Sequence, residues 1–463
     1  MAEEGSSTTG AEARPRLPSL AEASATWARI ALLSFGGPAG QIALMQRILV
    51  DEKRWLGEQR FLHALNFCML LPGPEAQQLC VYVGWLLNRT IGGLVAGVLF
   101  VLPGLLAILA LSFVYALYGD VGMVEGLFAG LKSGVVAIVL QALVRIAGRA
   151  LTSGASLAIA GLSFAAIFAF AVPFPVIILL AALFGYFGAR SGLDPFGRAR
   201  VAAASGAGDD ASTALGAHLS PRDSEVRGTR RAALTCLALW LTPTATLLLV
   251  LGGENVFSQI AVFFSTMAVV TFGGAYAVLA YVAQEAVGSY GWLAPGEMLD
   301  GLGMAETTPG PLIIVTQFVG FMGALREASG LPPLLAATLG ALLTTWVTFT
   351  PCFAWIFLGA PHMERLRSNA ALAAALSAIT AAVVGVISNL AVWFTLHVLF
   401  DRLDTFTGFG FALLVPELSS LNFPALLLVA GSLFAVFVLR AGLFAILGGT
   451  ALAGMALNAF GLT

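Results

Sequence analysis

Charged residues are scarce in this sequence. Only 10% of the 463 residues are Asp, Glu, Lys or Arg, whereas 59% are hydrophobic and the mean hydropathy is +0.91. A soluble protein carries roughly a quarter charged residues, so this composition excludes a water-covered globule and requires lipid over much of the surface. The net charge is −2 and the sequence has no basic run, so we expect no nucleic-acid partner.

The sequence also lacks the patterns of catalytic and metal sites. Its four cysteines are scattered in apolar segments without a CxxC pair, which favours a packing role over a disulfide frame or a metal site. There is no HExxH, no GxSxG and no phosphate-binding glycine loop. We therefore expect no enzyme, no cofactor and no metal ion.

The sequence does contain many apolar segments of about 20 residues, the length that crosses a hydrocarbon core of about 30 Å. This predicts an all-α polytopic membrane protein with six segments in each half and one between the halves. The first six segments lie near 24–48, 61–88, 92–118, 124–149, 155–171 and 174–189. The others lie near 232–251, 257–287, 297–322, 332–358, 369–399, 422–439 and 441–460.

An internal repeat relates the two halves. Ser34-Phe35-Gly36-Gly37 recurs as Thr271-Phe272-Gly273-Gly274, and 272 minus 35 is 237. Trp55-Leu56 recurs at 292–293 and Pro72-Gly73-Pro74 at 309–311, both with the same shift of 237. An even number of crossings followed by the unpaired segment makes the second half enter from the opposite face. We therefore predict an inverted-topology repeat.

The chain divides at its polar stretches. We predict a disordered N-terminal tail (1–20), a first membrane repeat (21–190), a linker (191–231), an unpaired linking transmembrane helix (232–251) and a second membrane repeat (252–463). The linker is rich in arginine, so the positive-inside rule places it and the N-terminus in the cytoplasm. The same rule favours re-entrant over fully spanning segments at 24–48 and 61–88, although both readings stay open.

The first two segments of each half have a helix breaker near the middle. Glycine tolerates positive φ, and proline lacks a backbone donor, so these segments are expected to break there. At membrane depth a break is tolerated only inside protein or beside a polar cavity, and the restarting helix offers free N–H groups and the positive end of its dipole. We expect an anion site near the midplane at Gly36, Gly37, Gly73, Gly273, Gly274 and Gly310. The alternative is that these residues only kink or pack helices.

Polar side chains surround these breaks. Hydroxyls and amides that can donate hydrogen bonds to an oxyanion are those of Ser34, Gln77, Gln78, Thr271, Thr307 and Thr308. Lys132, inside an apolar segment, is costly to insert and is a candidate counter-charge for a dianion, unless it pairs with a protein carboxylate. Glu75 and Glu306 are candidate proton carriers, with structural hydrogen-bonded carboxylates as the alternative.

The paired motifs resemble the long, two-domain chromate transporters of the chromate ion transporter family. The residues that carry the likeness are Phe-Gly-Gly-Pro at 35–38, Trp55-Leu56, Leu-Pro-Gly-Pro at 71–74 and their second-half copies. The second copy departs from the pattern at Ala275, where proline is absent. The resemblance implies efflux of chromate, with resistance to it, across the bacterial inner (plasma) membrane.

The residues alone indicate a carrier for a small oxyanion that works by alternating access. A sulfate- or molybdate-type oxyanion transporter and an anion channel are the alternatives, and a homodimer stays open. An inside-negative potential favours anion export by about 2.3 kcal/mol per charge per 100 mV, or about 4.6 kcal/mol for a dianion. Export is therefore the easier direction, and proton coupling would be an addition to it.

Overall fold

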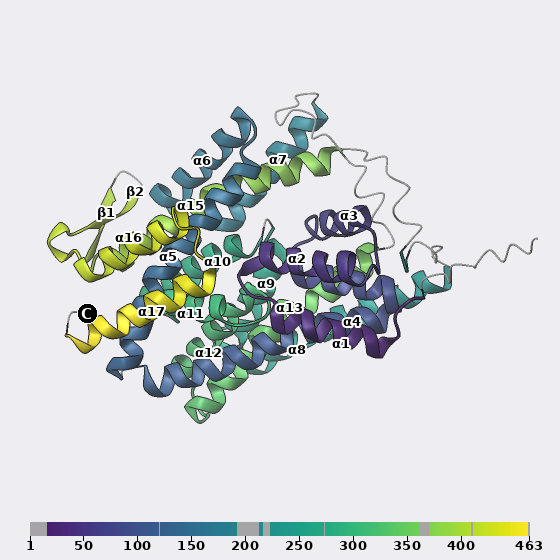
Figure 1. The fold of residues 1–463 in the computed structure, drawn as a ribbon, viewed down its shortest axis with the longest axis horizontal. Helices are drawn as coiled ribbons and strands as arrows, with labels where there is room; N and C mark the ends of the chain where they lie inside the picture. Colours follow the sequence, from purple (N-terminus) through teal and green to yellow (C-terminus); the bar gives the residue numbers. More distant parts are fainter. Residues whose placement is uncertain are drawn as a thin grey trace, which may run out of the picture.

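Each helix of the first half has a counterpart, in the same order, in the second half (Figure 1). The computed structural model describes residues 16–119, 121–191, 213–215, 223–272, 274–360, 370–408 and 411–461. The first half comprises α1 (Leu20–Leu33), α2 (Gly37–Gln46), η1 (Arg47–Glu52), α3 (Glu58–Cys68), α4 (Glu75–Tyr118), α5 (Gly122–Ala150), α6 (Gly154–Phe170) and α7 (Phe174–Arg190).

The second half repeats this order after an unpaired helix, α8 (Asp223–Leu251). It comprises α9 (Val256–Val270), α10 (Ala275–Ala283), η4 (Gln284–Ser289), α11 (Pro295–Thr307), η5 (Leu312–Ile314), α12 (Val315–Glu327), α13 (Pro333–Gly359), α15 (Ala370–Leu399), η7 (Leu418–Ser420), α16 (Phe423–Phe437) and α17 (Leu443–Ala459). Both η1 and η4 are π-helical turns that follow the second short helix of their half. The sequence repeat is thus a structural repeat.

The helix α4 consists of two antiparallel arms. Asn88 and Arg89 leave the helical region, and the chain reverses there between a first arm, residues 75–87, and a second arm, residues 90–118. A Cβ on Gly84 would lie 2.5 Å from the carbonyl oxygen of Gly92, so the two glycines let the arms touch. In the second half the same hairpin is formed by α12 and α13, which also pack together.

The first two segments of the first half fold back on themselves. Ion pairs Arg29–Glu52 (2.8 Å) and Lys53–Glu22 (3.5 Å) join α1 to the far end of the α2–η1 segment. These contacts require α1 and α2 to run in opposite directions. The helix α3 likewise returns along the first arm of α4, and the rings of Phe67 and Tyr82 lie 5.2 Å apart.

The equivalent segments of the second half fold back in the same way. Phe263 of α9 contacts Tyr281 of α10, with ring centroids 5.4 Å apart. Arg326, near the end of α12, pairs with Glu297, in the first turn of α11. All four segments are therefore re-entrant helix pairs, and the prediction of broken, re-entrant helices in two homologous halves is confirmed.

The two halves interlock through their last helices (Figure 1). The helices α6 and α7 pack against α15 of the second half, and α16 and α17 pack against α5 of the first. Small residues allow the close approach: a Cβ on Gly130 of α5 would lie 2.7 Å from the carbonyl carbon of Thr450 of α17. Each half thus completes the bundle of the other.

A β-hairpin between α15 and α16 is an addition that the sequence did not predict. Its strands, β1 (Leu403–Gly408) and β2 (Phe411–Pro416), pair antiparallel with Leu403 opposite Pro416. Phe411 contacts Phe170 at the end of α6, with ring centroids 5.0 Å apart. In the first half, by contrast, only residues 151–153 join α5 to α6.

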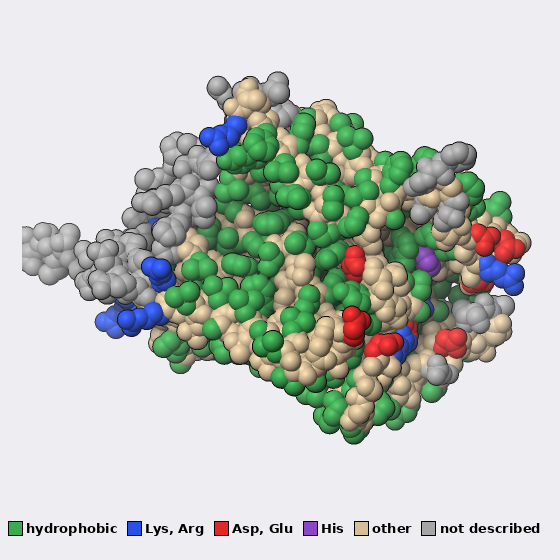
Figure 2. Space-filling model, turned by 180° about the vertical axis from the view of Figure 1, so that it is seen from behind, with side chains coloured by type: hydrophobic (Ala, Val, Ile, Leu, Met, Phe, Trp, Pro, Cys, Tyr) green, Lys and Arg blue, Asp and Glu red, His purple; other side chains and the backbone are tan. Residues whose placement is uncertain are grey.

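The outer surface suits a lipid environment. Among the described residues, five helices are long and apolar enough to cross a membrane, namely α4, α5, α8, α13 and α15. Large apolar side chains such as Leu162, Leu249 and Leu427 are more than two-thirds exposed. The face in Figure 2 is apolar across its middle, with basic side chains at one end and most acidic side chains toward the other. The prediction of a polytopic membrane protein is confirmed.

Candidate functional site

The four helix breaks meet at one place, which we call the junction: residues 34–38, 72–74, 271–272, 274 and 309–311. The backbone N–H of Gly310 donates to the carbonyl oxygen of Ser34 (2.8 Å), and that of Gly73 donates to the carbonyl oxygen of Thr271 (3.0 Å). Ser34 and Thr271 are repeat equivalents, as are Gly73 and Gly310. The two hydrogen bonds are therefore the same bond made twice, each linking one half to the other.

The proline-bearing long helices support both Pro-Gly-Pro turns. A Cβ on Gly310 would lie 3.2 Å from the Cα of Gly104, and a Cβ on Gly73 would lie 3.1 Å from the Sγ of Cys352. Gly104 and Cys352 each follow a proline, Pro103 in α4 and Pro351 in α13. The two turns thus rest on equivalent positions of equivalent helices, as a two-fold arrangement requires.

Contacts at Gly37 tie the two pairs of breaks together. A Cβ at this position would lie 3.6 Å from the hydroxyl of Tyr276, just after the third break, and 3.8 Å from Leu312, just after the fourth. The amide of Gln41 of α2 is buried and donates to the carbonyl oxygen of Gly310 (2.7 Å). The junction is consequently a single cluster of non-helical backbone inside the protein.

Glycine is required at the breaks because the backbone takes positive φ there. The φ angles of Gly36, Gly73, Gly274 and Gly310 are +77°, +108°, +99° and +107°. Three helices, α2, α4 and α10, begin immediately after these turns, and the first N–H groups of a helix have no intrahelical acceptor. The predicted Gly273 lies outside the described residues. The junction therefore gathers several helix N-termini, which favour an anion.

The predicted hydroxyls lie at the junction but donate to their own helices. Ser34 donates to the carbonyl oxygen of Ile30 (2.7 Å), and Thr271 to that of Met267. Thr307 and Thr308, at the end of α11, donate to carbonyl oxygens three or four residues earlier. These hydroxyls terminate helices in this conformation, so the remaining hydrogen-bond donors of the breaks are backbone N–H groups.

The two predicted glutamines are fully buried in the first turn of α4. The amide nitrogen of Gln78 donates to the carbonyl oxygen of Pro72 (2.6 Å), and that of Gln77 lies 3.4 Å from the carbonyl oxygen of Phe349. The amide oxygens of both have no hydrogen-bond partner among the described residues. The amide nitrogen of Gln78 lies beside the Gly73 turn, 3.2 Å from the position of a Cβ on Gly73.

The two predicted carboxylates differ in their surroundings. Glu306 is buried, and its Oε1 accepts a hydrogen bond from Tyr276 (2.9 Å). Arg145 of α5 acts electrostatically on both of these side chains. Glu306 thus faces the junction with a hydroxyl donor and a nearby cation. Glu75, the first residue of α4, is half-buried, and no hydrogen bond or ion pair to it is found within the described part of the chain.

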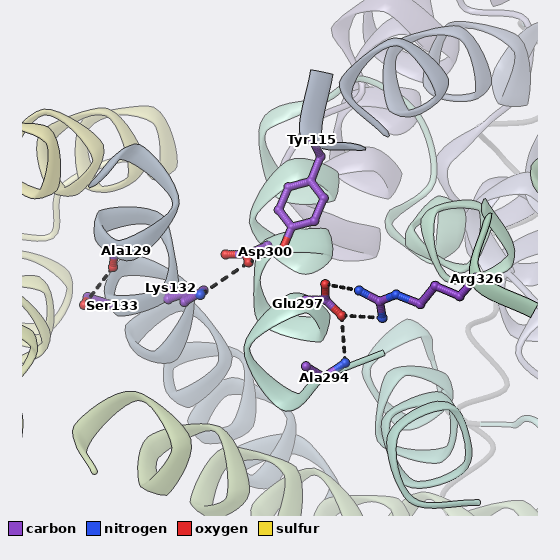
Figure 3. Close-up of polar contacts among 8 residues, drawn as sticks. All are labelled: Tyr115, Ala129, Lys132, Ser133, Ala294, Glu297, Asp300 and Arg326. Atoms are coloured by element: carbon purple, nitrogen blue, oxygen red, sulfur yellow. Dashed lines mark hydrogen bonds and ion pairs between the residues drawn. The ribbon is translucent and has the colours of Figure 1, made fainter. Parts of the chain in front are cut away.

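Lys132 lies away from the breaks, in a separate polar cluster (Figure 3). Its Nζ is 3.3 Å from Oδ2 of Asp300 of α11, and the same oxygen accepts a hydrogen bond from Tyr115 of α4 (2.9 Å). One turn earlier on α11, Glu297 pairs with Arg326 (2.8 Å). Of the predicted site residues, the structure therefore brings the breaks, Glu306 and the glutamines together, and Lys132 stands apart with Asp300.

Sequence reasoning missed Gln41, Tyr115, Tyr276 and Asp300. Asp300 had a usable signal, because a lone aspartate inside an apolar segment is as costly as Lys132. Tyr276 follows the second Gly-Gly pair by two residues, but a tyrosine in an apolar run does not stand out. Gln41 is equivalent to Val278 in the repeat, so comparison of the halves also gave no reason to select it.

Four re-entrant helix pairs that meet inside a lipid-facing bundle define a polytopic membrane transport protein. Residues 21–186 and 258–455 match the family model described as chromate transporter. The chain belongs to the chromate transporter family. The two matched segments coincide with the two structural halves, and the gap between them contains α8.

Three relatives show how far the likeness extends. A chromate transport protein of Pseudomonas aeruginosa is 32% identical over 432 residues, covering 91% of this chain and 93% of that protein. A chromate transport protein of Cupriavidus metallidurans is 27% identical over 78% of this chain and 79% of its own. A probable chromate transport protein of Synechococcus elongatus is 26% identical over 78% and 81%. No solved structure matches this chain.

Proposed function

We propose that this protein is a secondary transporter that exports chromate across the bacterial inner membrane by alternating access. Family membership supports chromate as the substrate. The observation that carries the transport mechanism is the pair of equivalent hydrogen bonds, Gly310 to Ser34 and Gly73 to Thr271. They join the two inverted halves at the breaks, so a movement of one half against the other acts directly on the site.

In this proposal the anion binds at the junction, mainly on backbone N–H groups. Gly36, Gly37 and Gly274 bring the backbone close to the ligand, and Gly273 belongs to the same turn in sequence. Gly73 and Gly310 shape the other two turns, while their own N–H groups donate to Thr271 and Ser34. A rotated Gln77 or Gln78 adds an amide donor, and Ser34, Thr271, Thr307 and Thr308 hold the helix ends that shape the turns. Lys132, the counter-charge expected from the sequence, pairs with Asp300 outside the junction.

Any coupled proton is assigned within the junction to Glu306 or Glu75. Glu306 is the better placed of the two, because Tyr276 orients its carboxylate beside Gly37. An uncharged Glu306 removes the repulsion between a carboxylate and an arriving dianion. A carboxylate that loses its proton as the anion leaves would link the flux of protons to the flux of the anion.

The proposed orientation places the N-terminus and the 191–231 linker in the cytoplasm. At one end of the visible face, basic side chains occur without acidic neighbours, as the positive-inside rule expects of a cytoplasmic face (Figure 2). The first turn of α11 carries Glu297, where α3 carries Arg60. Equivalent positions of an inverted repeat lie on opposite faces, so this difference agrees with an outer location for the start of α11.

The test is chromate uptake into inside-out vesicles that contain this protein. An imposed potential of 100 mV corresponds to about 4.6 kcal/mol for a dianion, which sustains roughly a thousand-fold gradient. Saturable accumulation that follows the potential and shows countertransport is expected. A flux without saturation or countertransport would indicate the channel alternative, and stronger inhibition by sulfate or molybdate than by chromate would indicate the other carriers.

Protein-free vesicles are the first control, and they are expected to show no chromate flux. A properly folded protein that accumulates no chromate under any gradient would refute the chromate assignment. The dependence of flux on protein density in the vesicles addresses the homodimer, which stays a prediction.

A further inference from the structure

The cluster around Lys132 has a feature that a simple structural ion pair does not need. Asp300 uses one oxygen, Oδ2, for both of its partners, the ammonium of Lys132 at 3.3 Å and the hydroxyl of Tyr115 at 2.9 Å. The other oxygen, Oδ1, is buried and has no hydrogen-bond partner among the described residues. Half of this carboxylate is therefore unsatisfied inside the protein, which is costly.

The two members of the pair differ in access. The side chain of Lys132 is 29% exposed, whereas that of Asp300 is 4% exposed. The ammonium of Lys132 is therefore the more accessible of the two charged groups; Figure 3 shows the contact between them.

The ammonium also lies against the first turn of α11. A Cβ on Gly296 would be only 3.2 Å from Nζ of Lys132, so glycine leaves the space that the ammonium occupies. In the first turn, Pro295 has no N–H and the N–H groups of Glu297 and Met298 donate to the carbonyl oxygen of Ala294, which leaves the N–H of Gly296. A helix N-terminus favours an anion over a cation, so an ammonium beside this helix end forms a better site for an oxyanion than for Lys132 alone.

We propose that Lys132 and the first turn of α11 form a second oxyanion subsite. In this subsite a tetrahedral dianion replaces Asp300 as the partner of Lys132, and Asp300 binds one proton from water at Oδ1. The proposal rests on the proposed function, which it deepens, because it adds a proton-binding carboxylate to the transport cycle. No covalent bond is made or broken other than the O–H bond.

Electrostatics explains why the two events are linked. Breaking a buried pair leaves an uncompensated charge, which is strongly destabilising, and here the remaining carboxylate would face a dianion. Protonation removes that charge. The ionisable groups acting on Asp300 are Lys132 of α5, Tyr115 of α4 and Glu297 of its own helix.

The other helices packed against α11 contribute little charge. The helix α17 carries no ionisable side chain, and in α15 the described residues 371–399 contain only His397, near the end of the helix. In α12 the ionisable residues are Arg326, which pairs with Glu297, and Glu327, the last residue. Asp300 is thus governed by Lys132 and Tyr115 at close range.

The subsite lies on one side of the junction. Asp300 precedes Glu306 by six residues, or about 9 Å at about 1.5 Å per residue along α11, in the direction of the face where α11 begins. In the proposed orientation this is the outer face. An anion that leaves the junction for the outside therefore meets Lys132 on its way.

The experiment measures chromate affinity of the purified full-length protein against pH, on the alkaline side where the anion itself does not titrate. Uptake of one proton per bound dianion makes the Kd rise about tenfold per pH unit. The wild type is expected to show this slope. Asp300→Asn is expected to abolish it and to bind chromate more tightly at high pH, because the competing carboxylate is gone. Lys132→Gln is expected to weaken binding.

Matched variants separate this subsite from the rest of the protein. Glu297→Gln lies one turn from Asp300 and is expected to keep the slope. If Asp300→Asn is unstable because Lys132 loses its partner, the double variant Lys132→Gln/Asp300→Asn removes both charges. The double variant is expected to be stable, to bind more weakly and to show no slope.

The inference is overturned if Asp300→Asn retains the slope, or if Glu306→Gln removes it while Asp300→Asn does not. It is equally overturned if Lys132→Gln binds chromate as the wild type does. A failure of the proposed function gives a different result, because vesicles that contain the wild-type protein then show no chromate flux at all.

Discussion

The two Pro-Gly-Pro turns allow the junction to be disturbed by a single methyl group. Replacing Gly310 by alanine places a Cβ 3.2 Å from the Cα and 3.3 Å from the backbone nitrogen of Gly104, on a residue with φ of +107°. Gly73→Ala is the matched change in the first half, with φ of +108° and Sγ of Cys352 at 3.1 Å. Because Gly104 presents backbone and Cys352 a side chain, Gly310→Ala has less room to relax.

The expected cost has two parts. A non-glycine residue held in a sparsely populated backbone region costs about 1–3 kcal/mol, and forcing an extra carbon into a packed site costs about 1–3 kcal/mol. Gly310→Ala should therefore destabilise the fold by about 2–6 kcal/mol, and Gly73→Ala by somewhat less. Both changes also strain the N–H bonds to Ser34 and Thr271, so chromate flux should fall further than stability alone explains.

Gly330→Ala provides the control for backbone strain. Its φ is +81°, yet no atom lies within 4 Å of the Cβ position, so only the first cost applies. Unfolding of the three variants in one detergent gives their stabilities, and counterflow of chromate in vesicles gives their transport. If Gly310→Ala matches Gly330→Ala in both assays, then the junction is neither tightly packed nor central to transport, and the reasoning fails.

Two further changes test the site and the interlocked bundle. Tyr276→Phe leaves Glu306 buried without its hydroxyl donor, which should cost about 1–3 kcal/mol of stability and shift the pH profile of chromate flux; an unchanged profile would exclude this hydrogen bond from transport. Gly130→Ala drives a Cβ into the carbonyl group of Thr450 and should separate α5 from α17, lowering the unfolding temperature by several degrees in a thermal scan. Gly148→Ala, with open space around the Cβ position, should be neutral or stabilising, and equal effects at 130 and 148 would contradict the close packing.

Periodicity and repeat arithmetic were enough to predict the architecture. The shift of 237 paired the breaks correctly. Gly310 contacts Ser34, and Gly73 contacts Thr271, through backbone atoms, so these contacts do not depend on the side chains. Apolar length gave the helices, because lipid requires it. The β-hairpin at 403–416 was missed because it has no counterpart in the first half and lies outside the apolar segments.

The side chains of the site were less predictable than its backbone. A hydroxyl next to a helix break can donate to a ligand or to its own helix, and Ser34 and Thr271 do the latter. The partner of Lys132 lies 168 positions away in sequence, since 300 minus 132 is 168. Such pairing depends on which face of α5 turns toward α11, and a single apolar segment does not specify that.

The symmetry of the junction and the asymmetry of its surroundings support different parts of the proposed cycle. Backbone donors occur in equivalent pairs, so a site built from them keeps the same character when the inverted halves exchange roles. The charged side chains break this equivalence: Asp300 stands where the first half has His63, and Glu297 where it has Arg60. Equivalent positions lie on opposite sides of an inverted repeat, and only in the second half do these positions carry carboxylates, which pair with Arg326 and Lys132. A proton-binding Asp300 on the outer side alone would favour release of the anion there. In this proposal the repeated backbone forms the anion site, and the side chains that differ between the halves determine the direction of transport.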